Sequence, residues 1–123
     1  KIVFSYPQEF GDMAVTGLTT TDEYILENPE TVQKVVSAYQ EALDYIYANP
    51  EEAKNVAIAR FSNLNEQSVR DAVDLAINDG VWPRSAETSE TSWDKAIQIR
   101  VQVGDIKNPP AFNEVVDNSF FQR

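Results

Sequence analysis

The pair Asn-Pro occurs at 28–29 and again at 49–50. Asparagine is favoured just before a helix, and proline is favoured at the first helical position. Between the two pairs the apolar residues recur at helical spacing, with polar residues on the opposite face. The apolar face consists of Val32, Val35, Val36, Tyr39, Leu43 and Ile46. The sequence therefore predicts a long amphipathic helix over 29–48, with a further helix starting at once after it.

Similar start and stop signals predict the other helices. Thr20-Thr21-Asp22-Glu23 has the form of a capping box and predicts a short helix ending near Glu27. Asn65 is a candidate cap for a helix that Gly80 ends, and another helix is expected over 90–103. Residues 81–89 form a connector without periodicity, and one more helical turn is expected within 112–121. With the helix that starts at Pro50, five main helices are expected.

Two β-favouring runs precede these helices, at 2–6 and at 13–20. Both are interpreted as strands. The expected fold is therefore mainly α, of the α+β kind, with a short two-strand β element at its N-terminus and one domain over 1–123. A two-stranded ribbon is only marginally stable alone. The open strand edges would allow pairing between copies, so a homodimer through these strands is a further expectation.

Charge and composition exclude several classes of function. The chain has 20 acidic and 10 basic residues, a formal net charge of −10, and neither cysteine nor histidine. Nucleic acids repel such a polyanion, so no nucleic-acid partner is expected. Thiol catalysis, zinc–thiolate sites and Ser-His triads are excluded by composition. No metal ion, cofactor or catalytic residue is expected. Acidic pairs such as Glu51-Glu52 are interpreted as first-turn residues that a helix dipole favours.

The candidate ligand-binding residues lie outside the expected helices. Tyr6, Phe10, Gly11 and Met13 surround a turn between the two expected strands, and loops at strand ends are common binding positions. Trp82 lies in the connector, where an indole could stack on a ligand or a partner. Packing of Trp82 back over the helices is the alternative interpretation.

Four segments in the same order resemble a known family. They are the run from Leu18 to Val32, the run Ala38–Ile46 followed by Asn49–Ala53, the run from Trp93 to Lys107, and Val116–Phe120. Together they look like the C-terminal part of solute-binding proteins of the nitrate/sulfonate/taurine class of ABC importers. The thiamine-pyrimidine-precursor binding proteins are part of that group. The resemblance spans nearly all of the chain.

The resemblance implies a fold and a function. Family members are more than twice this length and fold as two α/β lobes that close on the ligand, so the chain would be the C-terminal portion of a type II periplasmic-binding-protein lobe. The implied function is non-catalytic capture of a small anion or organic solute and its delivery to an ABC permease. The implied location is periplasmic or otherwise extracytoplasmic.

Two other functions remain open from the sequence. A stand-alone helical domain could dock a protein partner through its amphipathic helices and Trp82. An enzymatic role like that of the distantly similar thiamine-pyrimidine synthases is disfavoured, since that chemistry consumes a histidine and this chain has none.

Overall fold

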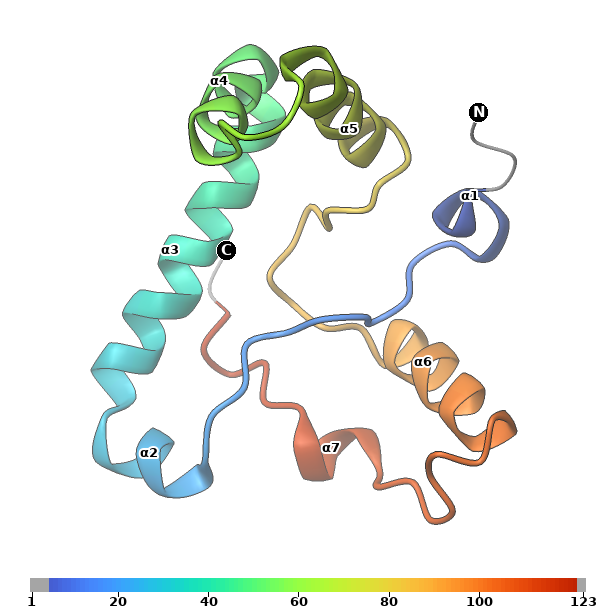
Figure 1. Ribbon diagram of the computed structural model, residues 1–123. Helices are drawn as coiled ribbons and strands as arrows, with labels where there is room; N and C mark the ends of the chain where they lie inside the picture. Colours follow the sequence, from blue (N-terminus) through green and yellow to red (C-terminus); the bar gives the residue numbers. More distant parts are fainter. Residues whose placement is uncertain (1–4, 122–123) are drawn as a thin grey trace.

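The computed structural model describes residues 5–121, and this part of the chain is helical. Seven helices are found within it (Figure 1). In chain order they are α1 (Tyr6–Phe10), α2 (Asp22–Glu27), α3 (Pro29–Ala48), α4 (Pro50–Arg60), α5 (Glu66–Asn78), α6 (Glu90–Gln102) and α7 (Phe112–Val115). The five main helices and the extra turn in the tail are confirmed, the latter as α7.

The expected two-strand β element is wrong. Residues 5–121 contain no strand. Residues 2–4 of the first expected strand lie outside the described residues, and its last residue, Tyr6, begins α1. The second run, 13–20, has no regular secondary structure. Its one backbone bond to a distant residue runs from the Ala14 N–H to the Ser92 carbonyl of α6, 3.0 Å away, so the segment lies beside a helix. The homodimer through strand edges loses its basis with the strands.

The helices begin close to the residues that the sequence predicts. One cap lies one residue later than expected, and two asparagines at cap positions make no capping bond. The cap of α2 is Thr21 instead of Thr20, and its hydroxyl accepts from the Tyr24 N–H. Asn65 caps α5 by accepting from the Ser68 N–H at 3.0 Å. Asn28 and Asn49 occupy the cap positions of α3 and α4, but neither side chain makes a capping bond. At these two starts the proline contributes through its fixed φ.

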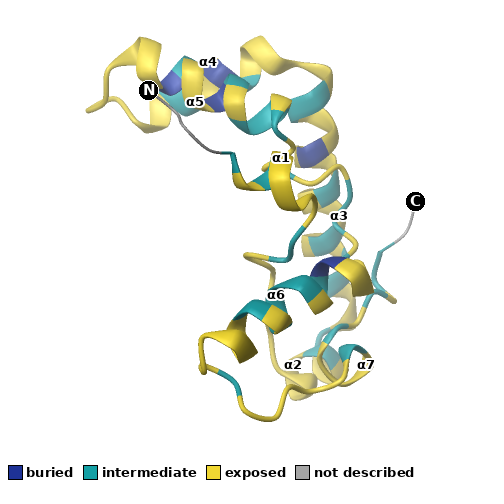
Figure 2. Ribbon diagram, turned by 90° about the vertical axis from the view of Figure 1, so that its right-hand side faces the viewer, coloured by how far each residue is buried: buried dark blue, intermediate teal, exposed yellow. Residues whose placement is uncertain are grey.

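The main packed unit is the pair α4 and α5, which also contacts the end of α3. The buried apolar residues are Leu43 of α3 and Val69 and Val73 of α5 (Figure 2). Lys54 of α4 and Ser92 of α6 are the buried polar residues. No side chain in the described part of the chain is less than 2% exposed, so the core is small.

The helices do not pack around one common core and form an open arrangement (Figure 1). The long helix α3 forms one side, α6 lies on the other, and the segment between α1 and α2 crosses between them. The chain exposes 9386 Å² of surface. A compact protein of 13.9 kDa would expose only about 6,700 Å². No helix among residues 5–121 combines the length and the apolar character needed to cross a membrane.

Candidate functional site

Helix α1 and the turn after it hold four of the five expected ligand-binding residues. Pro7 lies in the first turn of the helix, and Gly11 ends it with a φ of 67°, a region that favours glycine. The Gly11 N–H donates to the Pro7 carbonyl at 2.8 Å. Tyr6 and Phe10, four residues apart, therefore lie on one face. Their ring centroids are 4.5 Å apart, with the planes tilted by 33°.

Polar contacts hold α1 against the end of α5. Asp79, which follows α5, accepts from the Ser5 hydroxyl at 2.5 Å and from the Gln8 side-chain amide at 2.7 Å. Both oxygens of one carboxylate are thus used to fix both ends of the first turn of α1. These contacts join residues more than 70 positions apart in the sequence.

A lysine of α6 holds the other end of α1. The Lys95 ammonium donates to the Phe10 carbonyl at 2.8 Å. A Cβ at Gly11 would lie 3.4 Å from the same nitrogen, so the turn and the lysine are in close contact. Met13, two residues on, is half-buried. We name this region the α1 corner, defined by Tyr6, Phe10, Gly11, Met13 and Lys95.

The α1 corner combines two aromatic rings with a cation. Tyr6 and Phe10 are 37% and 51% exposed. An aromatic face and an ammonium group at the end of a short helix suit a small organic anion, which needs apolar contact and a positive charge together. Lys95 was missed by the sequence reasoning, and no local pattern in the chain points from α6 to α1.

Trp82, the fifth expected residue, has its contacts elsewhere. The Tyr47 hydroxyl of α3 donates to the Trp82 backbone carbonyl at 2.5 Å. The Arg84 guanidinium lies 3.9 Å from the centre of the Tyr47 ring, a cation–π contact. Gln40 accepts from the Ala86 N–H at 2.7 Å and donates to the Arg84 carbonyl at 3.2 Å. The connector is therefore fixed along α3, and Trp82 is half-buried there.

A shallow hollow of about 570 Å³ lies beside this part of α3. Its lining mixes one cation, two carboxylates, hydroxyls and an aromatic ring: Ser37, Gln40, Glu41, Asp44, Arg84, Ser85 and Phe121. The sequence reasoning missed this hollow because its residues come from three separate segments of the chain.

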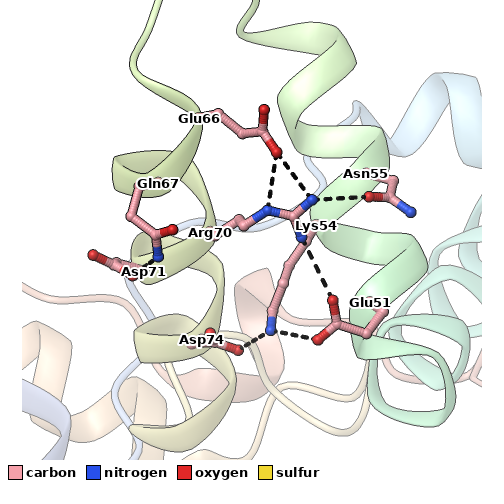
Figure 3. Close-up of polar contacts among 8 residues, drawn as sticks. All are labelled: Glu51, Lys54, Asn55, Glu66, Gln67, Arg70, Asp71 and Asp74. Atoms are coloured by element: carbon pink, nitrogen blue, oxygen red, sulfur yellow. Dashed lines mark hydrogen bonds and ion pairs between the residues drawn. The ribbon is translucent and has the colours of Figure 1, made fainter.

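A cluster of charged side chains in mutual contact joins α4 to α5 (Figure 3). Lys54 lies 2.8 Å from Glu51 and 2.6 Å from Asp74. Arg70 lies 3.1 Å from Glu66 and 3.5 Å from Glu51. The hydrogen bond to Asp74 raises the pKa of Lys54 above its usual value, and the hydrogen bond to Glu51 adds to this effect. All charges here are paired with opposite charges, so the cluster is a structural contact between two helices.

The titratable side chains show no metal site. Within residues 5–121, no group of three or more His, Cys, Asp or Glu side chains is placed to hold a metal ion. The acidic residues of the α4–α5 cluster are paired with Lys54 and Arg70 instead.

Comparisons with known proteins give one match. A search of curated proteins found no match, and neither did a search of solved structures. A scan of family models matches residues 1–53, the segment that contains α1, α2, α3 and the start of α4. The matching model is that of the NMT1/THI5-like family, which confirms over this part of the chain the resemblance to the solute-binding proteins of ABC importers of the nitrate, sulfonate and taurine type.

Proposed function

We propose that this chain is the C-terminal part of a non-catalytic solute-binding component of an ABC importer. The match of residues 1–53 to the NMT1/THI5-like family carries the proposal, since that family consists mainly of solute-binding proteins. The solutes are small anions or organic molecules of the nitrate, sulfonate, taurine or thiamine-precursor type. The partner for delivery is an ABC permease, and the site of action is the periplasm.

The exposed surface supports the view that the chain works as one part of a larger body. It exceeds the surface of a compact protein of this mass by about 2,700 Å². Apolar residues that should be covered contribute to it, among them Leu26 at 81% exposure and Val15 at 74%. A second lobe and the rest of the first would cover such residues and close around a solute.

The α1 corner is the proposed contact of this chain with the solute. Tyr6 and Phe10 would pack on its apolar part, the Gly11 turn would allow close approach, and Met13 would add a further apolar contact. The Lys95 ammonium, 2.8 Å from the Phe10 carbonyl, provides a positive charge beside these residues for an anionic group. Trp82, fixed along α3 by its backbone, is the proposed contact from the connector.

Calorimetric titration tests the proposal on the protein isolated from the cells that produce it. Nitrate, an alkylsulfonate, taurine and a pyrimidine are the probes, and saturable binding of one of them is expected. Tyr6→Ala should weaken this binding about tenfold or more, as expected when an aromatic contact is lost. The matched control is Tyr24→Ala, which removes an exposed tyrosine of α2 and should leave the affinity unchanged. Failure of all four probes to bind would refute the proposal.

The intact mass of the same isolated protein separates this function from a stand-alone interaction domain. That second candidate is favoured by the large exposed apolar surface alone. A mass more than twice 13.9 kDa is expected for a two-lobed binding protein. A mass near 13.9 kDa would support the interaction domain instead.

A further inference from the structure

The rest of the chain covers only part of the apolar face of α3. The contact side consists of Val36, Gln40, Leu43 and Tyr47, all of them buried or half-buried. A row of exposed residues lies on another side of the helix. Their spacing of i, i+3, i+4, i+7 and i+10 places them on one face. We name this row the α3 stripe, and it consists of Val35, Ala38, Tyr39, Ala42 and Tyr45.

Three polar side chains determine which face of α3 packs against the rest of the chain. Gln33 donates to the Phe120 carbonyl at 2.7 Å, Gln40 bonds twice to the connector, and Tyr47 donates to the Trp82 carbonyl. All three anchors lie on the contact side. They turn the apolar stripe toward solvent, where Val35 is 49% exposed, Tyr39 39% and Tyr45 50%. A row of apolar side chains this exposed marks an interaction surface.

We propose that the α3 stripe binds the same stripe of a second copy of the chain, with the two helices antiparallel. In a two-fold pair whose axis passes between residues 38 and 39, Tyr39 lies over Ala38 of the second copy and Val35 lies over its Ala42. Large side chains thus meet small ones at the centre of the contact. This alternation lets two helices approach closely and interdigitate.

The charges beside the stripe are also complementary. Lys34 and Glu41 flank it on the same side, one heptad apart, and neither takes part in an ion pair with the described residues 5–121. In the antiparallel pair, Lys34 of one copy approaches Glu41 of the other, and symmetry repeats the contact. Repulsion between two chains of charge −10 opposes association, but at physiological ionic strength salt largely screens exposed charges that lie more than about 8 Å apart.

The exposed area is sufficient for such a dimer. A standard interface buries about 800 Å² on each partner. The chain exposes about 2,700 Å² more than a compact protein of its mass. Pairing through α3 would cover part of this excess surface. The proposal is independent of solute binding, because it uses no residue of the α1 corner.

Light scattering on the 123-residue chain, coupled to size-exclusion chromatography, tests the proposal. A mass of about twice 13.9 kDa is expected at high concentration, with dissociation on dilution across about 1–300 μM, the range of a micromolar dimer. Ala38→Glu places a charge under Tyr39 of the second copy and should weaken association at least about tenfold. The control is Ala59→Glu, the same change at an exposed alanine of α4, which should leave association unchanged.

Two further measurements establish the orientation. Lys34→Glu should weaken the dimer, and the double variant Lys34→Glu, Glu41→Lys should restore it. Because the chain has no cysteine, Ala38→Cys introduces a single thiol near the two-fold axis. Oxidation should link two copies of this variant by a disulfide, whereas Ala59→Cys should form no disulfide-linked dimer. A chain that is monomeric at the highest concentration, or a dimer that Ala38→Glu does not weaken, would overturn the proposal.

Discussion

The Lys54 ammonium of α4 lies 2.6 Å from the Asp74 carboxylate of α5 and 2.8 Å from Glu51 one turn earlier in its own helix. Lys54 is 8% exposed, among few buried polar residues in the described part of the chain. It joins the two helices that form the main packed unit, so the ion pair and the core around Val69 and Val73 stabilise the same contact.

Stability should therefore fall at high pH through Lys54. Its carboxylate partners, Asp74 and then Glu51, raise its pKa above the ordinary lysine value of 10.5. A group with a raised pKa contributes its full stabilisation below its unfolded pKa and loses it as the pH rises through its folded pKa. The free energy of unfolding should decrease above about pH 10.5. Urea unfolding at pH 8 and pH 11 should show a smaller decrease for Lys54→Met. Lys107→Met, in a loop after α6, is the control and should behave as the wild type.

Capping of α5 should depend on the Asn65 side chain. Its oxygen accepts from the Ser68 N–H at 3.0 Å, whereas Asn49 occupies the same position before α4 without a capping bond. Asn65→Ala should lower the free energy of unfolding by about 1 kcal/mol, a normal loss for a cap. Asn49→Ala should cost less than half of that. Urea unfolding monitored by circular dichroism compares the two, and equal losses would contradict the role of the hydrogen bond.

Truncation of leucine should destabilise the protein far more at one position than at another. Leu43 on the contact side of α3 is 4% exposed, while Leu26 in α2 is 81% exposed. Leu43→Ala removes buried methyl groups and leaves a cavity, which should cost about 3 kcal/mol. Leu26→Ala should change the free energy of unfolding by less than about 0.5 kcal/mol, as exposed substitutions do. Thermal and urea unfolding measure both. A small loss at Leu43 would show that the core near α3 is open to solvent.

The sequence predicted the helices whose signals are local. Asn-Pro at 28–29 and 49–50 and the cap Asn65 mark starts that the structure confirms. The missed helix α1 also has local signals, since Pro7 lies in its first turn and Gly11 ends it with a positive φ. These signals were outweighed by the β-branched and aromatic residues around them, which favour strands only where neighbouring strands exist.

The contacts that build the candidate site could not be predicted in this way. Asp79 holds Ser5, and Lys95 holds Phe10, across 74 and 85 positions of the chain. Single hydrogen bonds over such separations leave no periodic pattern in a sequence. Long-range hydrogen bonds also decide which face of α3 is covered, because Gln40 binds the connector 44 residues away. Periodicity identified the apolar face of α3 but could not show which part of it the chain covers.

Asp79 should control the order of α1. Its carboxylate accepts from Ser5 and Gln8, and these are the contacts that join α1 to the end of α5. Asp79→Ala removes both acceptors, so α1 should open more often and its amides should exchange faster with solvent. Hydrogen exchange read by mass spectrometry should show faster exchange over residues 6–11, with the exchange of α4 unchanged. Asp71→Ala is the matched control, because among residues 5–121 Asp71 accepts a hydrogen bond from Gln67 of its own helix and from no other residue. Unchanged exchange in α1 after Asp79→Ala would show that the remaining contacts, the Lys95–Phe10 bond among them, are enough to hold the α1 corner.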